Sequence, residues 1–291
     1  MVLATVKEAW QPLRSQWLGE RVLLAFEDAS LRGVSLRQGA IHTQPWVSML
    51  PAQALERGMP DQIDVLGDFL GDLLLSMDLG QQALRIALPP QAAHWRVITW
   101  PLQEWPDEPI AALRTIDPEL GLPFDLADAV IDVQPLPGKP LQALLVAAPR
   151  LLVEAWITVL NIAGLTLERL VPSQVCLRTA LLPALQALNP ANGVLLLQAE
   201  ADQTCLVQLW QQGVPRYERR LLSDDEALSE QLQTLLAFYA SRDPGFAVGQ
   251  LWLTAPLPQQ DELAASLQLP IELIDASAYG SLVLQGLAQL R

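Results

Sequence analysis

The sequence predicts an α/β protein built from two similar halves, with a separate module inserted into the first half. Two stretches, 22–88 and 193–254, each read as three strands followed by a helix and a fourth strand. A third stretch, 85–165, reads strand–strand–helix–strand–strand–helix and has the size of a small domain. Strands that alternate with helices in this way are typical of α/β folds. A chain of 291 residues is long enough for two domains of this kind.

The first 20 residues predict an N-terminal amphipathic helix, over 1–20. Val6, Trp10, Leu13 and Trp17 follow one another at spacings of four, three and four residues, which places them on one side of a helix. That apolar side could pack on the rest of this protein, or on a partner or a membrane. The segment is not expected to be a signal peptide, because charged residues interrupt it.

Residues 21–84 and 166–190 are expected to form the first half. The run 22–26 is continuously apolar, which indicates a central strand. The expected elements are, in order, strands at 22–26, 33–38 and 40–47, a helix that Asp61 caps and that runs to about 77, and a strand that ends at 88.

The inserted module is expected to span 85–165. Its elements are two apolar runs at 86–89 and 95–101, a helix at 107–117, strands that end at 134 and 148, and a helix at 150–163. Trp95, Trp100, Trp105 and Trp156 lie in this module. Aromatic residues fill protein cores and also dominate binding surfaces, so both roles stay open here.

The second half is expected to span 191–291. The residues Asn189-Pro190-Ala191-Asn192-Gly193 break the chain before it. Its expected elements are strands at 193–199, 204–211 and 214–221, a long helix to about 240, a strand at 250–254, a helix at 258–267, a strand at 270–274 and a last helix at 277–290.

The composition excludes several classes of function. The net charge of −14 argues against a nucleic-acid binder and against direct docking on anionic lipid, both of which need a basic face. Cys176 and Cys205 are expected to be buried thiols in a reducing compartment, and no Cys or His pair has the spacing of metal ligands. No apolar stretch is long enough to cross a membrane. We therefore expect a cytoplasmic protein without a metal and without direct membrane insertion.

The repeated order of elements points to the actin-like (ribonuclease H-like) two-domain fold, in which two similar α/β halves face each other. In that fold, each half aims its first hairpin turn at a nucleotide held between the halves. Active members need glycine in these turns, so that the backbone can approach phosphate, and aspartate to handle magnesium.

The chain resembles the PilM family, the actin-like cytoplasmic proteins of type IV pilus and competence machines, and the likeness is concentrated in the module. The matching residues are Ala87-Leu88-Pro89, Trp100-Pro101, Asp117 six residues before Pro123-Phe124, then Asp125-Leu126, Asp132-Val133-Gln134, Leu145-Val146-Ala147-Ala148 and Ala163-Gly164-Leu165. Their order and spacing are kept over 85–165. The resemblance implies that this module is an α+β subdomain of the inserted 1C type, which replaces a subdomain of actin.

The same resemblance implies a scaffold at the cytoplasmic face of the inner membrane, held there through a partner. In the family, the N-terminal tail of a PilN-like bitopic membrane protein lies in a groove between the inserted subdomain and the first α/β half. Other inner-membrane components of the pilus are expected partners too, and the sequence leaves open whether the protein forms a homo-oligomer. The residues expected to line the peptide groove are Leu88, Trp100, Pro123, Phe124 and Leu126.

The nucleotide turns depart from the family pattern. In the family, the first phosphate turn reads Asp-x-Gly, and here it reads Phe26-Glu27-Asp28-Ala29-Ser30. The second phosphate turn of the family reads Asp-Ile-Gly, and here it reads Gln198-Ala199-Glu200-Ala201-Asp202. The adenosine turn of the family carries two glycines, and here it reads Leu253-Thr254-Ala255-Pro256. Without glycine, and with acidic residues that repel phosphate, ATP and magnesium are disfavoured and a pseudo-ATPase is expected. The vestigial turn residues are Glu27, Asp28, Ser30, Glu200, Asp202, Thr204 and Thr254.

Two alternatives remain beside the non-enzymatic scaffold. The first is an active actin-like ATPase or phosphotransferase, which the missing glycines disfavour. The second is the cytoplasmic domain of a GspL-like type II secretion protein, although such chains continue into a transmembrane helix. Neither His42 nor His94 lies next to a plausible nucleophile in the sequence, so no catalytic residues are expected.

Overall fold

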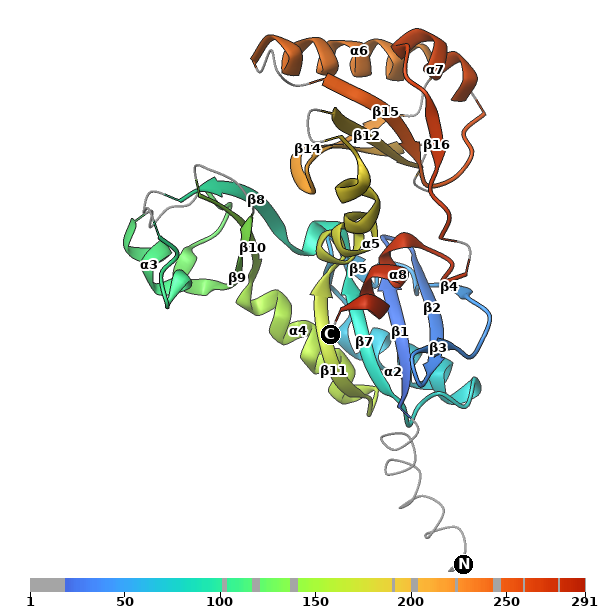
Figure 1. Cartoon of the computed structure of the whole chain (residues 1–291). Helices are drawn as coiled ribbons and strands as arrows, with labels where there is room; N and C mark the ends of the chain where they lie inside the picture. Colours follow the sequence, from blue (N-terminus) through green and yellow to red (C-terminus); the bar gives the residue numbers. More distant parts are fainter. Residues whose placement is uncertain are drawn as a thin grey trace, which may run out of the picture. The chain divides into compact units, whose positions relative to one another are not determined.

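The computed structural model describes residues 19–100, 104–116, 121–136, 141–189, 192–199, 204–222, 225–242, 247–258, 260–276 and 278–290. The N-terminal helix expected over 1–20 falls almost entirely outside these residues. The chain divides into two compact units, of which the first contains 1–180 and 277–291 and the second contains 181–276. Figure 1 labels the elements of both units.

A mixed sheet forms the centre of the first unit. Its strands are β1 (Glu20–Phe26), β2 (Ser30–Arg37), β3 (Ala40–Ile41), β4 (Trp46–Met49), β7 (Ala83–Leu88) and β11 (Thr166–Pro172). They lie in the order β11–β7–β1–β2, and β3 and β4 share the outer edge of β2. β2 is antiparallel to β1, whereas β7 and β11 run parallel to it. The apolar run 22–26 is therefore a central strand, as its composition predicts.

Local details of this half differ from the sequence prediction. The strand expected over 40–47 is split into β3 and β4, and Pro45 lies in the gap, where it has no N–H to offer the ladder. A small hairpin of β5 (Leu55–Glu56) and β6 (Met59–Pro60) was not expected. Asp61 does not cap the next helix, because the helix begins at Ile63 and its N-cap residue is Gln62, whose side chain makes no capping hydrogen bond.

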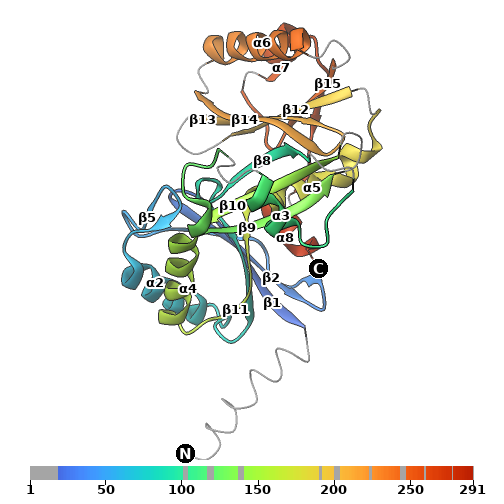
Figure 2. The ribbon, with the colours of Figure 1, turned by 90° about the vertical axis from the view of Figure 1, so that its left-hand side faces the viewer.

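Two helices cover each face of the first sheet. On one face, α2 (Ile63–Ser76) and α4 (Arg150–Ile162) lie side by side, as Figure 2 shows. The Trp156 ring packs edge-on against Phe26 at 4.5 Å, and its Nε1 donates to the Gly58 carbonyl at 3.0 Å. On the other face, α8 (Leu282–Gln289) and the beginning of α5 (Ser173–Ala187) bury Leu284, Leu287 and Cys176 against β1.

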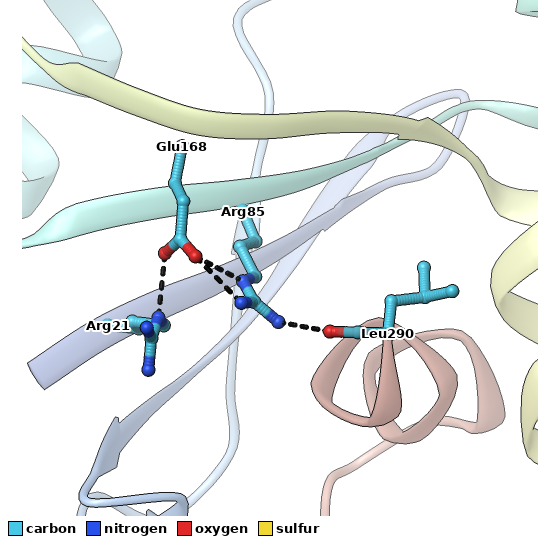
Figure 3. A network of polar contacts seen from close by, with 4 residues as sticks. All are labelled: Arg21, Arg85, Glu168 and Leu290. Atoms are coloured by element: carbon cyan, nitrogen blue, oxygen red, sulfur yellow. Dashed lines mark hydrogen bonds and ion pairs between the residues drawn. The ribbon is translucent and has the colours of Figure 1, made fainter. Parts of the chain in front are cut away.

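The last helix thus belongs to the first unit, whereas the sequence analysis assigned all of 191–291 to the second half. Besides its apolar packing, α8 is held by the buried Arg85 on β7, whose Nη1 donates to the Leu290 carbonyl at 2.6 Å (Figure 3). The same guanidinium donates to Glu168 on β11, which also accepts from Arg21 at 2.7 Å. These contacts explain why the chain returns to the first sheet after the second unit.

The inserted module is shorter than expected. It consists of η1 (Pro90–Ala92), β8 (His94–Thr99), α3 (Pro109–Ile116), η2 (Leu126–Asp128), β9 (Ala129–Leu136) and β10 (Gln142–Pro149). An antiparallel sheet in the order β8–β10–β9 buries a small core of its own, which includes Trp100 and Leu113. β7 and α4, which the prediction included in the module, instead pack in the core of the first sheet.

The second unit repeats the order of the first sheet. Its elements are β12 (Asn192–Ala199), β13 (Thr204–Gln211), β14 (Val214–Leu222), α6 (Asp225–Arg242), β15 (Ala247–Leu253), α7 (Gln260–Leu267) and β16 (Ile271–Leu273). The strands lie in the order β14–β13–β12–β15–β16. β13 is antiparallel to both of its neighbours, β12 and β14, whereas β15 and β16 run parallel to β12. β12, β13, β15 and β16 thus correspond to β1, β2, β7 and β11. The repeat that the sequence predicts is therefore a repeat of sheet topology.

Candidate functional site

The first candidate site is the turn between β1 and β2, where the fold would place phosphate. The N–H of Glu27 donates to the Ser30 carbonyl at 2.9 Å, which closes the turn. The Glu27 carboxylate then accepts from the Ser30 hydroxyl and from Nε of Arg32, both at 2.6 Å. A carboxylate of the chain itself therefore occupies two donors that an anion would need at this turn. Asp28 adds a second carboxylate and accepts from Nε2 of Gln91 at 3.0 Å.

Polar side chains gather where the parallel strands β7 and β11 end. Nε2 of Gln174, at the start of α5, donates to the carbonyls of Pro90 at 2.6 Å and Ala93 at 3.4 Å. The Ser173 hydroxyl and Oε1 of Gln174 are buried and have no hydrogen-bond partner among the described residues. Gln174 thus fixes the connection from the first sheet to the module.

A second contact joins α5 to the module one helical turn later. Nη1 of Arg178 donates to Oε1 of Gln134 on β9 at 3.2 Å. Burial lowers the pKa of the Arg178 guanidinium from its ordinary value. Gln134, Gln174 and Arg178 were not among the residues predicted from the sequence. Gln174 and Arg178 lie four residues apart and so share one face of α5, but no local pattern marks either of them as a contact of the module.

The remaining turn residues belong to the second unit. Thr204 begins β13, and Thr254 directly follows β15, where its N–H donates to the Leu197 carbonyl at 3.2 Å. Glu200 and Asp202 lie outside the described residues.

The residues expected to line a peptide groove do not share one surface. Leu88 is buried in the core of the first sheet, and Trp100 and Leu126 are buried in the core of the module. Pro123 is exposed, and Phe124 is half-buried with its ring 5.5 Å from that of His94. A bound peptide would therefore touch Pro123 and Phe124 but not the other three side chains. The resemblance to the family implied that these three side chains line the groove, and their burial shows that they belong to cores instead.

β8 begins beside Phe124, whose ring contacts that of His94, the first residue of the strand. β8 pairs with β10 on one side, and no described strand pairs with its other side. Its side chains are exposed or half-buried from His94 to Thr99. Burial lowers the pKa of His94, so its imidazole is neutral at pH 7. Such an edge can accept an extended segment through backbone hydrogen bonds, with Phe124 as an apolar contact.

The described residues offer no alternative built from metals or reactive thiols. No three His, Cys, Asp or Glu side chains of the described part gather closely enough to hold a metal ion. Cys176 and Cys205 are both buried free thiols. In the part of the chain that the structure covers, none of the helices is long and apolar enough to cross a membrane.

Comparison with known proteins places the fold. No family model and no curated protein matches the sequence. Among solved structures, a chain of the PilM–PilN type IV pilus biogenesis complex is similar over 92% of this chain and 97% of its own, with a TM-score of 0.74 and 17% identity. A Bacteroides thetaiotaomicron protein with an actin-like ATPase fold is similar over 96% and 98%, with a TM-score of 0.56 and 11% identity. The cytoplasmic domain of EpsL, an inner-membrane component of the type II secretion system of Vibrio cholerae, covers 93% of both chains, with a TM-score of 0.50 and 15% identity. The chain therefore has the actin-like fold, and its structure is similar to that of the type IV pilus and type II secretion proteins that share this fold.

Proposed function

We propose that the protein is a non-enzymatic cytoplasmic scaffold of a type IV pilus or competence machine, and that it binds the N-terminal tail of a PilN-like inner-membrane protein. The observation that carries the proposal is the similarity to a chain of the PilM–PilN complex over 92% of this chain. The uncovered remainder is too short to account for the inserted module, so the likeness extends into the part where the sequence resemblance is concentrated.

The β8 edge is the surface that we propose for the tail. An extended tail gains backbone hydrogen bonds along β8, and Phe124 offers apolar contact next to His94, the first residue of the strand. The net charge of −14 favours a basic tail through long-range attraction. Binding through the partner would hold the protein at the inner membrane without a membrane helix of its own.

The absence of enzymatic activity is part of the proposal and is supported by the first turn. The Glu27 carboxylate takes the Ser30 and Arg32 donors, so a phosphate would have to displace a charged group that is already hydrogen-bonded. No glycine in this turn lets the backbone approach a phosphate closely. We expect no heat of binding in calorimetric titration with Mg-ATP. Micromolar binding would contradict this part of the proposal and favour an active ATPase.

Binding of the tail is measured with a fluorescent peptide that carries the N-terminal sequence of a PilN-like protein from the same organism. Wild type is expected to bind, and Phe124→Ala to weaken binding at least about ten-fold, as loss of an aromatic anchor does. Val130→Ala is the matched control, because Val130 is exposed on β9, the opposite edge of the same sheet. If Phe124→Ala and Val130→Ala have the same small effect, the β8 placement is wrong. If wild type binds no PilN-like tail, the scaffold proposal fails.

A second candidate is a GspL-like role, supported by the similarity to the EpsL cytoplasmic domain. Pull-down from a membrane fraction distinguishes the two roles. Recovery of pilus inner-membrane proteins supports the first, and recovery of type II secretion components supports the second.

A further inference from the structure

The outer strand of the second unit, β14, has one unpaired edge. β14 is nine residues long and pairs with β13 on one side, while no described strand pairs with the other. An exposed edge of this length is a template for another extended chain. This edge is independent of the module and of the function proposed above.

A β-bulge shapes the beginning of this edge. Leu209 pairs with Tyr217 and Trp210 pairs with Pro215, so Arg216 is the extra residue and has no cross-strand partner. The Tyr239 hydroxyl of α6 donates to the Arg216 carbonyl at 3.0 Å and so fixes the bulge. Burial raises the pKa of Tyr239, which keeps its hydroxyl protonated as a donor at neutral pH. The bulge therefore holds the exposed Arg216 side chain in a defined place.

Aromatic and cationic side chains continue from the bulge onto the end of α6. The rings of Tyr217 and Phe238 lie 6.0 and 5.4 Å from that of Tyr239, both edge-on. The guanidinium of Arg242 lies over the Phe238 ring at 5.1 Å from its centre, and Phe238 is nevertheless 50% exposed. Aromatic residues and arginine are the types that dominate binding hot spots.

The charge of this surface is opposite to that of the whole protein. Arg216 and Arg219 are exposed on β14, and neither forms an ion pair with another described residue. The chain as a whole carries 32 acidic and 18 basic side chains. Two unpaired arginines on an open edge strand, beside a stacked Arg242, thus form a local basic surface that complements acidic groups.

We infer that the β14 edge and the end of α6 bind an acidic, extended segment of a partner protein. The segment adds to β14 as a further strand, its carboxylates contact Arg216 and Arg219, and an apolar residue covers Phe238. The backbone hydrogen bonds supply affinity, and the arginines select acidic over basic segments.

The test uses the full chain and two labelled peptides that alternate valine with glutamate or with lysine. Fluorescence anisotropy is expected to show binding of the glutamate peptide, weakened at least about ten-fold by the double change Arg216→Glu and Arg219→Glu. The control is Arg114→Glu with Arg150→Glu, which changes the net charge equally on exposed residues of the first unit and should leave affinity within about two-fold. Phe238→Ala is expected to weaken binding without a change in charge. Hydrogen exchange of the β14 amides should slow when the glutamate peptide is added.

Three results would overturn the inference. The first is that the lysine peptide binds as well as the glutamate peptide, or that the two double variants lose the same affinity, because the effect would then be one of net charge alone. The second is that the glutamate peptide binds without protection of the β14 amides, which would exclude strand addition. The third is that a single-stranded oligonucleotide of equal charge binds more tightly and depends on Arg216 and Arg219, which would make the surface a nucleic-acid site.

Discussion

Substitution of Gly286 by alanine tests the packing that returns α8 to the first sheet. Alanine stabilises a helix interior by about 1 kcal/mol relative to glycine, so helix propensity alone predicts a more stable protein. The structure predicts the reverse, because a Cβ at Gly286 would lie 1.8 Å from the carbonyl oxygen of Cys176 and 2.5 Å from its carbonyl carbon. That oxygen belongs to the backbone of α5, which cannot rotate away as a side chain can.

The magnitude follows from the distance that must open. The separation has to widen from 1.8 Å to the 3.4 Å at which ordinary contacts begin, and this movement pulls Leu284 and Leu287 from the core that they share with β1. It also lengthens the 2.6 Å bond from Arg85 to the Leu290 carbonyl. Overpacking of this kind costs about 1–3 kcal/mol or more. An opening of this size against backbone puts the cost at the upper end of that range, about 3 kcal/mol, so after subtraction of the propensity gain of about 1 kcal/mol we expect a loss of about 2 kcal/mol, or roughly 5 °C in the melting temperature.

Thermal unfolding followed by tryptophan fluorescence measures this loss, with Gly71→Ala as the matched control. Gly71 also lies in a helix, but its added Cβ would be 3.2 Å from the Ala163 carbonyl, so a shift of a few tenths of an ångström suffices. The control should therefore melt within a few degrees of wild type, since its propensity gain offsets a small strain. A Gly286→Ala protein as stable as wild type would refute the packing argument.

Two further predictions concern ionisable groups whose pKa is shifted. Partial desolvation alone would raise the pKa of Glu168, but the hydrogen bonds and charges of Arg85 and Arg21 outweigh it and hold the pKa below its ordinary value. Its stabilising contribution is therefore present above the unfolded-state pKa of about 4.3 and is lost as pH falls through the lower folded-state pKa. The urea midpoint of Glu168→Gln should therefore be lower than that of wild type at pH 7, and it should decrease less steeply as the pH is lowered. Midpoints of the two proteins that decrease equally steeply with falling pH would contradict the prediction. Burial also raises the pKa of the Cys176 thiol to about 12, and Cys205 is equally buried, so a disulfide reagent at pH 8 should label neither thiol until urea unfolds the protein.

The fold could be read from the sequence because its central strands carry strong local signals. The runs 22–26 and 194–197 are continuously apolar, which indicates central strands that are buried on both faces. The repeat of sheet order then follows from the order of elements along the chain. The position of α8 could not be read in this way, because an apolar stripe does not say which sheet it covers, and the contacts of Gly286 and Arg85 that place it join residues far apart in the sequence.

The candidate site was harder to predict because the same residue types serve cores and surfaces. Trp100 and Leu126 were expected in a groove and lie in a core, since the small module needs large side chains to bury enough apolar area. Gln174 and Arg178 belong to no sequence motif, yet their hydrogen bonds connect α5 to the module. These contacts join residues far apart in the sequence, so no local pattern predicts them.

The turn between β1 and β2 differs from a phosphate-binding turn in two ways that act together, because it lacks glycine and carries the Glu27 carboxylate. Loss of glycine removes close backbone approach, which a ligand could still tolerate if side-chain donors remained. Glu27 removes that option as well, because it binds the Ser30 hydroxyl and the Arg32 guanidinium within the turn itself. Replacing Glu27 alone would free these donors without restoring the backbone, and adding glycine alone would leave the carboxylate in place. Phosphate binding at this turn would therefore require both a glycine in the turn and removal of the Glu27 carboxylate. The hydrogen bonds of Glu27 to Ser30 and Arg32 instead give the turn a structural role, because they join its two sides at the end of the β1–β2 hairpin.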